Sequence, residues 1–214
     1  GPLYRGSGLF MPILLSSTLI LVGPAWCSHL CYIGAWDDLA ARRKRLPRKL
    51  PRWRNGLRLA ILIVFVAVPV LLRETGVEGG NIVPYVIGFG AASLLVMAVA
   101  STRTGAMAHC SSWCPIGLVT TTLGRVSPFR VLVGNGCTTC GACYTVCRYD
   151  ALSADHIARG KVGANCTLCG ECLPACGHGA LKMAFGPLRG AGVRTTFIVL
   201  VVSLHAVFLA FGRI

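Results

Sequence analysis

Acidic side chains are scarce in this chain of 214 residues. Asp and Glu together number 7 against 21 Lys and Arg, and only 13% of the residues are charged. An ordinary soluble domain carries about 25% charged residues, so the composition argues against one. The sequence also lacks a nucleophile–base pair, a nucleotide-binding glycine loop and paired carboxylates. Stand-alone substrate chemistry is therefore not expected.

Two further patterns are missing at the amino terminus. There is no signal-peptide cleavage pattern, and the chain opens Gly1-Pro2-Leu3 without a methionine. We expect either processing or a missing upstream part. The chain is instead rich in hydrophobic residues, which make up 54% of it, and it carries a formal net charge of +14. Such a charge suggests nucleic acid or anionic lipid as a partner.

Four apolar runs predict membrane-spanning helices, each near the length that crosses a hydrocarbon core of ~30 Å; they cover residues 9–26, 57–72, 82–100 and 193–211. The second run is short, so Arg58 and Arg73 are expected to snorkel at its ends. The stretch 42–58 holds nine Lys and Arg and no acid. It could bind nucleic acid, but its apolar flanks favour a cytoplasmic loop. Both termini are then outside, and all twelve cysteines are at the cytoplasmic face.

Eight cysteines form two Cys-x2-Cys-x2-Cys-x3-Cys runs, 137–147 and 166–176. This spacing is typical of bacterial two-cluster ferredoxins, in which each run lends its last cysteine to the other run's [4Fe–4S] cluster. Gly141 and Gly170 are expected to make the sharp turns. The predicted ligand sets are Cys137, Cys140, Cys143 and Cys176 for the first cluster, and Cys166, Cys169, Cys172 and Cys147 for the second.

Zinc sites and a disulfide framework are the alternatives for these runs. Zinc needs only two Cys-x2-Cys pairs, so the extra cysteines at fixed offsets favour clusters. Disulfides need an oxidising compartment, which the predicted cytoplasmic location excludes. The proline that usually follows the fourth cysteine is replaced by Arg148 and Gly177, which is expected to affect the potential more than the cluster. Short strands are expected near 130–133 and 180–185, followed by a linker at 186–190.

The remaining four cysteines belong to an internal repeat. Segments 27–34 and 110–117 both read Cys-Ser-x2-Cys-x-Ile-Gly, and each follows an apolar run that enters the cytoplasm. We interpret this as two helix ends that bring four thiols to one third iron–sulfur centre, either [2Fe–2S] or [4Fe–4S]. Free cysteines, disulfides or a thiol relay are the alternatives. The proposed metal ligands are Cys27, Cys31, Cys110 and Cys114.

Three histidines are further candidates. His29 and His109 flank the two cysteine pairs, where they could tune or replace a ligand or bind a quinol headgroup, or merely be solvated at the interface. His205 lies in the fourth apolar run, and ionisable residues inside membranes are functional candidates. Quinone binding near His205 is one interpretation. A bis-histidine haem is not favoured, because no partner histidine lies at matching depth.

Together the patterns predict an α-helical membrane protein with four transmembrane helices and an inserted cytoplasmic α+β module of the bacterial two-cluster ferredoxin type. Residues 1–134 would form the membrane domain with three spans and both Cys-x3-Cys motifs. Residues 135–186 would form the ferredoxin domain, and residues 187–214 the linker and fourth helix.

On these motifs the chain resembles the membrane polyferredoxin family over residues 9–211. The group includes the membrane iron–sulfur subunits of periplasmic nitrate reductase systems, the membrane part of nitrous-oxide-reductase regulators and the membrane ferredoxin of methylamine-utilisation clusters. The resemblance implies transfer of electrons between the quinone pool, the cytoplasmic side and periplasmic redox enzymes. One departure is Tyr32, which stands where the family has the proline that Pro115 retains.

The predicted function is therefore that of a membrane-anchored electron-transfer subunit. It would relay electrons between the quinone pool or a cytoplasmic-side donor and partner subunits of a respiratory complex in the bacterial cytoplasmic (inner) membrane. Expected partners are the lipid bilayer and other redox subunits, including a cytochrome or a periplasmic iron–sulfur protein, but no nucleic acid. Alternatives are a metal-reducing assembly factor for a respiratory oxidase and the membrane part of a redox regulator.

Overall fold

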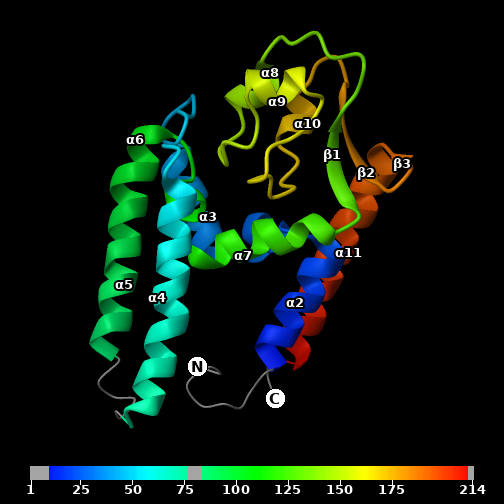
Figure 1. Ribbon diagram of the computed structural model, residues 1–214. Coiled ribbons are helices and arrows are strands. Elements are labelled where there is room, and N and C mark those ends of the chain that lie inside the picture. The colour runs from blue at the N-terminus through cyan, green and yellow to red at the C-terminus, as the bar shows by residue number, and fades with distance from the viewer. Residues whose placement is uncertain (1–9, 77–82, 212–214) are drawn as a thin grey trace.

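The computed structural model describes residues 10–76 and 83–211. Within them, two pairs of long helices stand beneath a small module that contains a sheet (Figure 1). One pair is α4 (Arg54–Glu74) with α5 (Val83–Val96), and the other is α2 (Phe10–Val22) with α11 (Ala191–Phe211). Helix α7 (Pro115–Leu123) crosses between the pairs. The long helices are therefore separate from the module but joined to it at one end.

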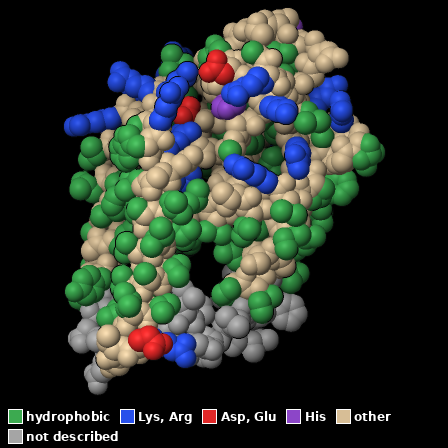
Figure 2. Space-filling model, viewed as in Figure 1, with side chains coloured by type: hydrophobic (Ala, Val, Ile, Leu, Met, Phe, Trp, Pro, Cys, Tyr) green, Lys and Arg blue, Asp and Glu red, His purple; other side chains and the backbone are tan. Residues whose placement is uncertain are grey.

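Two helices in the described ranges are long and apolar enough to cross a membrane, Arg54–Glu74 and Val83–Thr104. The second is α5 continued through the π-helical segment η3 (Met97–Ser101) and α6 (Thr102–Thr104). Their apolar side chains are mostly exposed, whereas a helix of a soluble protein would turn them to a core. In Figure 2 hydrophobic side chains cover the lower helices, while most Lys and Arg lie higher, around the module.

The other two predicted spans correspond to α2 and α11 in the structure. Helix α2 ends at Val22 instead of continuing to Trp26, because Gly23 adopts φ +65° and Pro24 follows it. Its 13 described residues measure about 20 Å at ~1.5 Å per residue. Helix α11 is as long as α4, at 21 residues each, and its segment Ala191–Val207 is apolar. Among the described residues, length and composition support two of the four expected spans, 57–72 and 82–100. Residues 9 and 82 of the predicted runs lie outside the described ranges.

The module contains a three-stranded antiparallel sheet in the order β1-β2-β3, made of β1 (Phe129–Val133), β2 (Leu181–Phe185) and β3 (Leu188–Arg189). The first two strands confirm, within one residue, those expected from the sequence. The expected linker at 186–190 is wrong, because β3 pairs with β2 before α11 begins. Gly186 (φ +55°) lies in the turn of that hairpin, and Gly190 (φ +121°) lies between β3 and α11.

The core of the module extends into the helices below. Three short helices cover the sheet: α8 (Ala142–Thr145), α9 (Ala154–Ala158) and α10 (Cys172–Ala175). Buried Phe129 of β1 packs its ring against Phe197 of α11, with centroids 5.1 Å apart, and Val22 of α2 belongs to the same hydrophobic cluster. The sheet is therefore fixed to the α2–α11 pair by apolar contacts.

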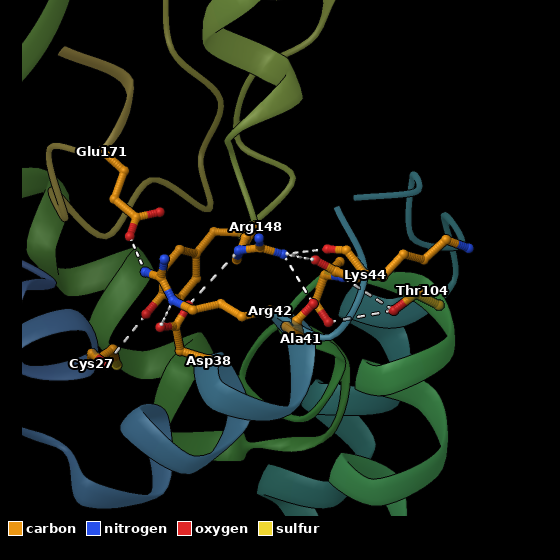
Figure 3. A network of polar contacts seen from close by, with 11 residues as sticks. Cys27, Asp38, Ala41, Arg42, Lys44, Thr104, Arg148 and Glu171 are labelled. Atoms are coloured by element: carbon orange, nitrogen blue, oxygen red, sulfur yellow. Dashed lines mark hydrogen bonds and ion pairs between the residues drawn. The ribbon is translucent and has the colours of Figure 1, made fainter. Parts of the chain in front are cut away.

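Polar contacts fix the module to the other helix pair through Arg148. Its side chain is 13% exposed. Arg148 Nη1 donates to the carbonyl of Ala41 at 3.0 Å, that of Lys44 at 3.3 Å and that of Gly105 at 2.8 Å. Ala41 is the last residue of α3 (Tyr32–Ala41), and Gly105 directly follows α6. Figure 3 shows the guanidinium reaching these helix ends, where the backbone carbonyls favour cations.

Asp150 makes a second attachment, to the basic stretch that the sequence marked as a loop. Asp150 Oδ2 accepts from Arg54 Nη1 at 2.7 Å and from the backbone N–H of Leu50 at 3.3 Å. Arg42 bridges Asp38 and Glu171 nearby, as Figure 3 shows. Part of the basic stretch therefore binds the cysteine-rich module itself.

Candidate iron–sulfur sites

Four cysteines from both runs line one small cavity in the module: Cys137, Cys140, Cys143 and Cys176. This is the set expected for the first cluster, including the cysteine lent by the second run. Burial raises the pKa of the Cys143 thiol, and the charges of Cys137 and Cys176 add to the rise. At Cys176 backbone N–H groups, first that of Leu181, outweigh burial and lower the thiol pKa. Such donors favour the thiolate, the form that binds metal.

The other four cysteines of the two runs also gather at one place. Burial raises the pKa of Cys166 to about 12 and that of Cys169 to about 11, and Cys147 of the first run is near enough to add to both shifts. It adds likewise to the raised pKa of Cys172. The Ala151 N–H donates to Cys147 Sγ at 3.3 Å. The structure thus places the last cysteine of each run beside the first three of the other.

Both runs fold into the same loop. Thr139 and Leu168, the residues before each second cysteine, have φ of +54° and +58°. Gly141 and Gly170, the residues after it, have φ of +85° and +77°, so the turns expected at both glycines are confirmed. Left-handed positions of this kind occur in the backbone nests that hold anions and iron–sulfur groups. The donor sets and loops therefore fit the expected clusters.

The internal repeat is also a repeat in structure. Each first cysteine lies in a five-residue π-helix, η1 (Trp26–Leu30) or η4 (His109–Trp113). Each second cysteine ends it in an extended conformation, with φ/ψ of −80°/114° at Cys31 and −70°/116° at Cys114. Helices α3 and α7 follow directly. Single-turn π segments are frequent at functional sites.

A glycine closes each copy of this turn. A Cβ on Gly34 would lie 2.5 Å from the Cys27 carbonyl oxygen, and one on Gly117 would lie 2.7 Å from the Cys110 carbonyl oxygen. Real Cβ atoms do not approach so closely, so both positions need a residue without a side chain. The two glycines of the motif therefore let each following helix fold back onto its own cysteine turn.

The four sulfurs of the repeat interact with one another. Burial raises the pKa of Cys27 to about 12, and Cys114 and Cys31 add to the rise. Burial also raises the pKa of Cys110, and Asp37, Cys114 and Cys27 raise it further. The pKa of Cys114 is raised by burial and then by Cys31. Each of the four cysteines of the repeat therefore lies within electrostatic range of at least one cysteine of the other copy.

A small cavity lies beside Cys27 and Cys110 and is also lined by Arg58, Tyr149 and Asn165. Arg58 is only 1% exposed, so the expectation that it snorkels is wrong. Helix α7 and the η4 turn cover this end of α4. The Arg58 Nε donates to the Cys114 carbonyl at 3.4 Å.

Tyr149 connects the repeat to the second run. Its buried ring packs against Met107, and Cys110 of the repeat and Cys169 of the run lie against the same cluster. The Tyr149 hydroxyl donates to the Cys27 carbonyl at 3.4 Å. Sequence reasoning missed Tyr149 and Arg58, and the only local signal for Tyr149 was its place two residues after a cluster cysteine.

The three histidines have different surroundings. His109 is buried beside Asp37, and burial lowers its pKa while the carboxylate opposes the shift. The ring of His29 packs at 5.6 Å from that of Phe197, and His205 lies 6.4 Å from Trp26. Within the described residues none of them lines the cavity beside Cys27 and Cys110.

All twelve cysteines lie in the described part of the chain and all are free thiols. No group of three or more His, Cys, Asp or Glu side chains within the described ranges is arranged to hold a single metal ion.

A family model described as "4Fe-4S binding domain" matches the chain twice, at residues 4–51 and 86–133. The two matches coincide with the two copies of the repeat, so they include its four cysteines and lie outside the two runs. No solved structure matches the chain. With the cysteine geometry, these matches define the class: the chain is a ferredoxin-type iron–sulfur protein.

Within that class the chain is related to ferredoxin-type proteins of methylamine utilisation. It is 27% identical over 146 residues to the "Methylamine utilization ferredoxin-type protein MauN" of Paracoccus denitrificans (strain Pd 1222). The match covers 60% of this chain and 50% of the relative, so the chain spans about half the length of the protein it matches.

Proposed function

We propose that the protein relays single electrons within a membrane complex, between the quinone pool or a cytoplasmic-side donor and partner redox subunits. The observation that carries this proposal is the continuity of three cysteine sets. Cysteines of both module sets belong to one hydrophobic cluster. Tyr149 then joins the second set, through Cys169, to the repeat, through Cys110.

Iron–sulfur clusters, when bound, supply one-electron redox chemistry. The residues of this chain hold the ligand thiols in place, exclude water and direct N–H donors at sulfur. The N–H groups at Cys176 and Cys147 are of this kind. Burial and such donors are the means by which a protein sets the potential of a cluster.

The third centre is the boldest part of the proposal. We assign it to Cys27, Cys31, Cys110 and Cys114, on two equivalent turns closed by Gly34 and Gly117. Its support is the mutual proximity of the four sulfurs and the coincidence of the 4Fe-4S binding domain matches with the two copies.

For the membrane anchor we propose all four long helices, with the module on the cytoplasmic side of the bacterial inner membrane. Exposed apolar side chains on the α2–α11 pair support this, such as Ile13 of α2 and Val202 of α11, at 65% and 60% exposure. The Lys and Arg that surround the module in Figure 2 favour the cytoplasmic side. Partners would be a cytochrome or a periplasmic iron–sulfur protein, and the relative's name suggests methylamine utilisation as one setting.

Iron quantitation and EPR test this function. The full chain is purified anaerobically in mild detergent, and its iron per chain and low-temperature EPR redox titration are recorded. Two cubanes account for about eight irons and a third centre for about two or four more. Cys110→Ser should lower the iron content toward eight, while Ser112→Ala, on the same turn, should not.

The outcomes separate the parts of the proposal. Iron near eight in the wild type, unchanged by Cys110→Ser, would remove the third centre and leave the two module clusters. A colourless protein that contains zinc would remove the whole electron-transfer function. Co-purification from the native membrane then identifies the partners, and recovery apart from any respiratory complex would contradict the role as a subunit.

A further inference from the structure

A buried cation faces the cysteines of the repeat. Arg58 is 1% exposed and lines the same cavity as Cys27 and Cys110. Its hydrogen-bond acceptors are neutral and distant, the Cys114 carbonyl and the Asn165 side-chain oxygen, both at 3.4 Å. The ion pairs found among the described residues do not include Arg58.

Burying a guanidinium without a counter-charge is strongly unfavourable, and an arginine cannot escape by losing its proton. Neutral thiols or disulfides in the cavity would leave the charge uncompensated. Thiolates that hold an iron–sulfur centre are negative and would compensate it. Arg58 touches both copies of the repeat, because it shares a cavity with Cys27 and Cys110 and its Nε donates to the Cys114 carbonyl.

The site is built to admit this side chain. A Cβ on Gly117 would lie 2.7 Å from Arg58 Nη2, so the glycine of the second copy leaves room for the guanidinium as well as for the Cys110 carbonyl. On its other side Arg58 Nη1 donates to Asn165, the residue before Cys166 of the second run. The cation therefore lies between the repeat and the second set of the module.

We propose that Arg58 is the counter-ion of a net-negative four-cysteine centre and raises its reduction potential. This inference rests on the third centre of the proposed function. One-electron reduction adds one negative charge to the centre, and a fixed positive charge at short range in a low dielectric stabilises the reduced form more than the oxidised form. The contribution of Arg58 is thus electrostatic, and it acts through the centre without accepting the electron.

The test compares Arg58→Gln, which removes the charge, with Arg58→Lys, which keeps it. Arg52→Gln is the matched control, because it makes the same charge change at an exposed site before the same helix. Each full-length protein is purified anaerobically, its iron per chain is measured, and it is titrated with a low-potential chemical reductant that donates one electron per centre. The EPR signal of the Cys137 set serves as the internal reference.

We expect Arg58→Gln to lower the equilibrium constant for reduction of the third centre about tenfold, which is about 59 mV for one electron. Arg58→Lys should retain most of the wild-type potential, and Arg52→Gln should leave it unchanged because exposed charges are screened. Loss of the third centre's iron in Arg58→Gln but not in Arg58→Lys would also support the counter-ion.

Two results would overturn the inference while leaving the third centre intact. One is a third signal that titrates at the same potential in Arg58→Gln as in the wild type. The other is equal loss of its iron in Arg58→Gln and Arg58→Lys when the reference signal is retained. A wild-type protein without a third signal would instead refute the centre itself, and the counter-ion with it.

Discussion

Replacing Arg148 with alanine should loosen the module from the α4–α5 side of the helices. The guanidinium donates to three carbonyls, those of Ala41, Lys44 and Gly105, and all three bonds come from Nη1. That nitrogen carries two protons, so about two bonds of full strength are lost. Hydrogen bonds that involve a charged group contribute about 1.5–3 kcal/mol each, which gives a cost of about 3–6 kcal/mol for two such bonds.

Arg42→Ala is the matched control at the same interface. Arg42 pairs with Asp38 and Glu171, but its side chain is 50% exposed. Exposed ion pairs contribute roughly 0.2–1 kcal/mol each, so the control should cost less than about 2 kcal/mol. Asp38 keeps Arg42 as a partner when Arg148 is replaced, so the larger cost arises from the carbonyls.

Thermal bleaching of the cluster absorbance, in one detergent and under anaerobic conditions, measures the difference. A change of 1 kcal/mol moves the midpoint by about 2–4 °C in a protein of this size. Arg148→Ala should therefore lower the midpoint by roughly 6–24 °C, and Arg42→Ala by only a few degrees. Equal midpoints for the two variants, or a greater loss with Arg42→Ala, would show that Arg148 does not hold the module.

Three further predictions concern the cysteine sites. Gly117→Ala should destabilise the protein or deplete its iron, because the new Cβ lies 2.7 Å from a carbonyl and a guanidinium; Gly56→Ala, with open space around it, is the control for thermal stability and iron content. Cys176→Ser should abolish the EPR signal of the Cys137 set and Cys147→Ser that of the Cys166 set; the opposite assignment would show that the runs do not exchange cysteines. Tyr149→Ala should slow electron transfer between module and repeat in flash-reduction kinetics and cost about 3–5 kcal/mol as a large-to-small change, whereas Tyr149→Phe should keep the ring contacts and most of the rate.

The sequence was sufficient where function requires a fixed local spacing. Each run brings three cysteines to one loop over seven residues, and the positive φ of Gly141 and Gly170 follows from the same turn. The repeat was visible for the same reason, since Cys27 and Cys110 begin identical patterns. Over such short stretches, the spacing of residues along the chain largely determines their arrangement in space.

Features set by tertiary contacts could not be found in this way. A lone arginine at the start of an apolar helix usually snorkels, and only the covering of α4 by α7 and η4 buries Arg58. Helix α2 ends early because of Gly23 and Pro24. A hydropathy pattern does not register the effect of these two residues on the backbone. The residues 186–190 have linker composition, yet they extend the sheet because β2 offers an unpaired edge.

The two residues that replace the usual proline show how the module has adapted to its place on the helices. Arg148 and Gly177 occupy equivalent positions after the fourth cysteine of each run. Arg148 faces the ends of α3 and α6 and binds their carbonyls. Gly177 is exposed, and a Cβ there would meet nothing within 4 Å. The first run therefore ends at an interface and the second at the surface. The proposed exchange of cysteines would then transmit the attachment at Arg148 to the second set, because Cys147, the ligand expected for that set, directly precedes Arg148.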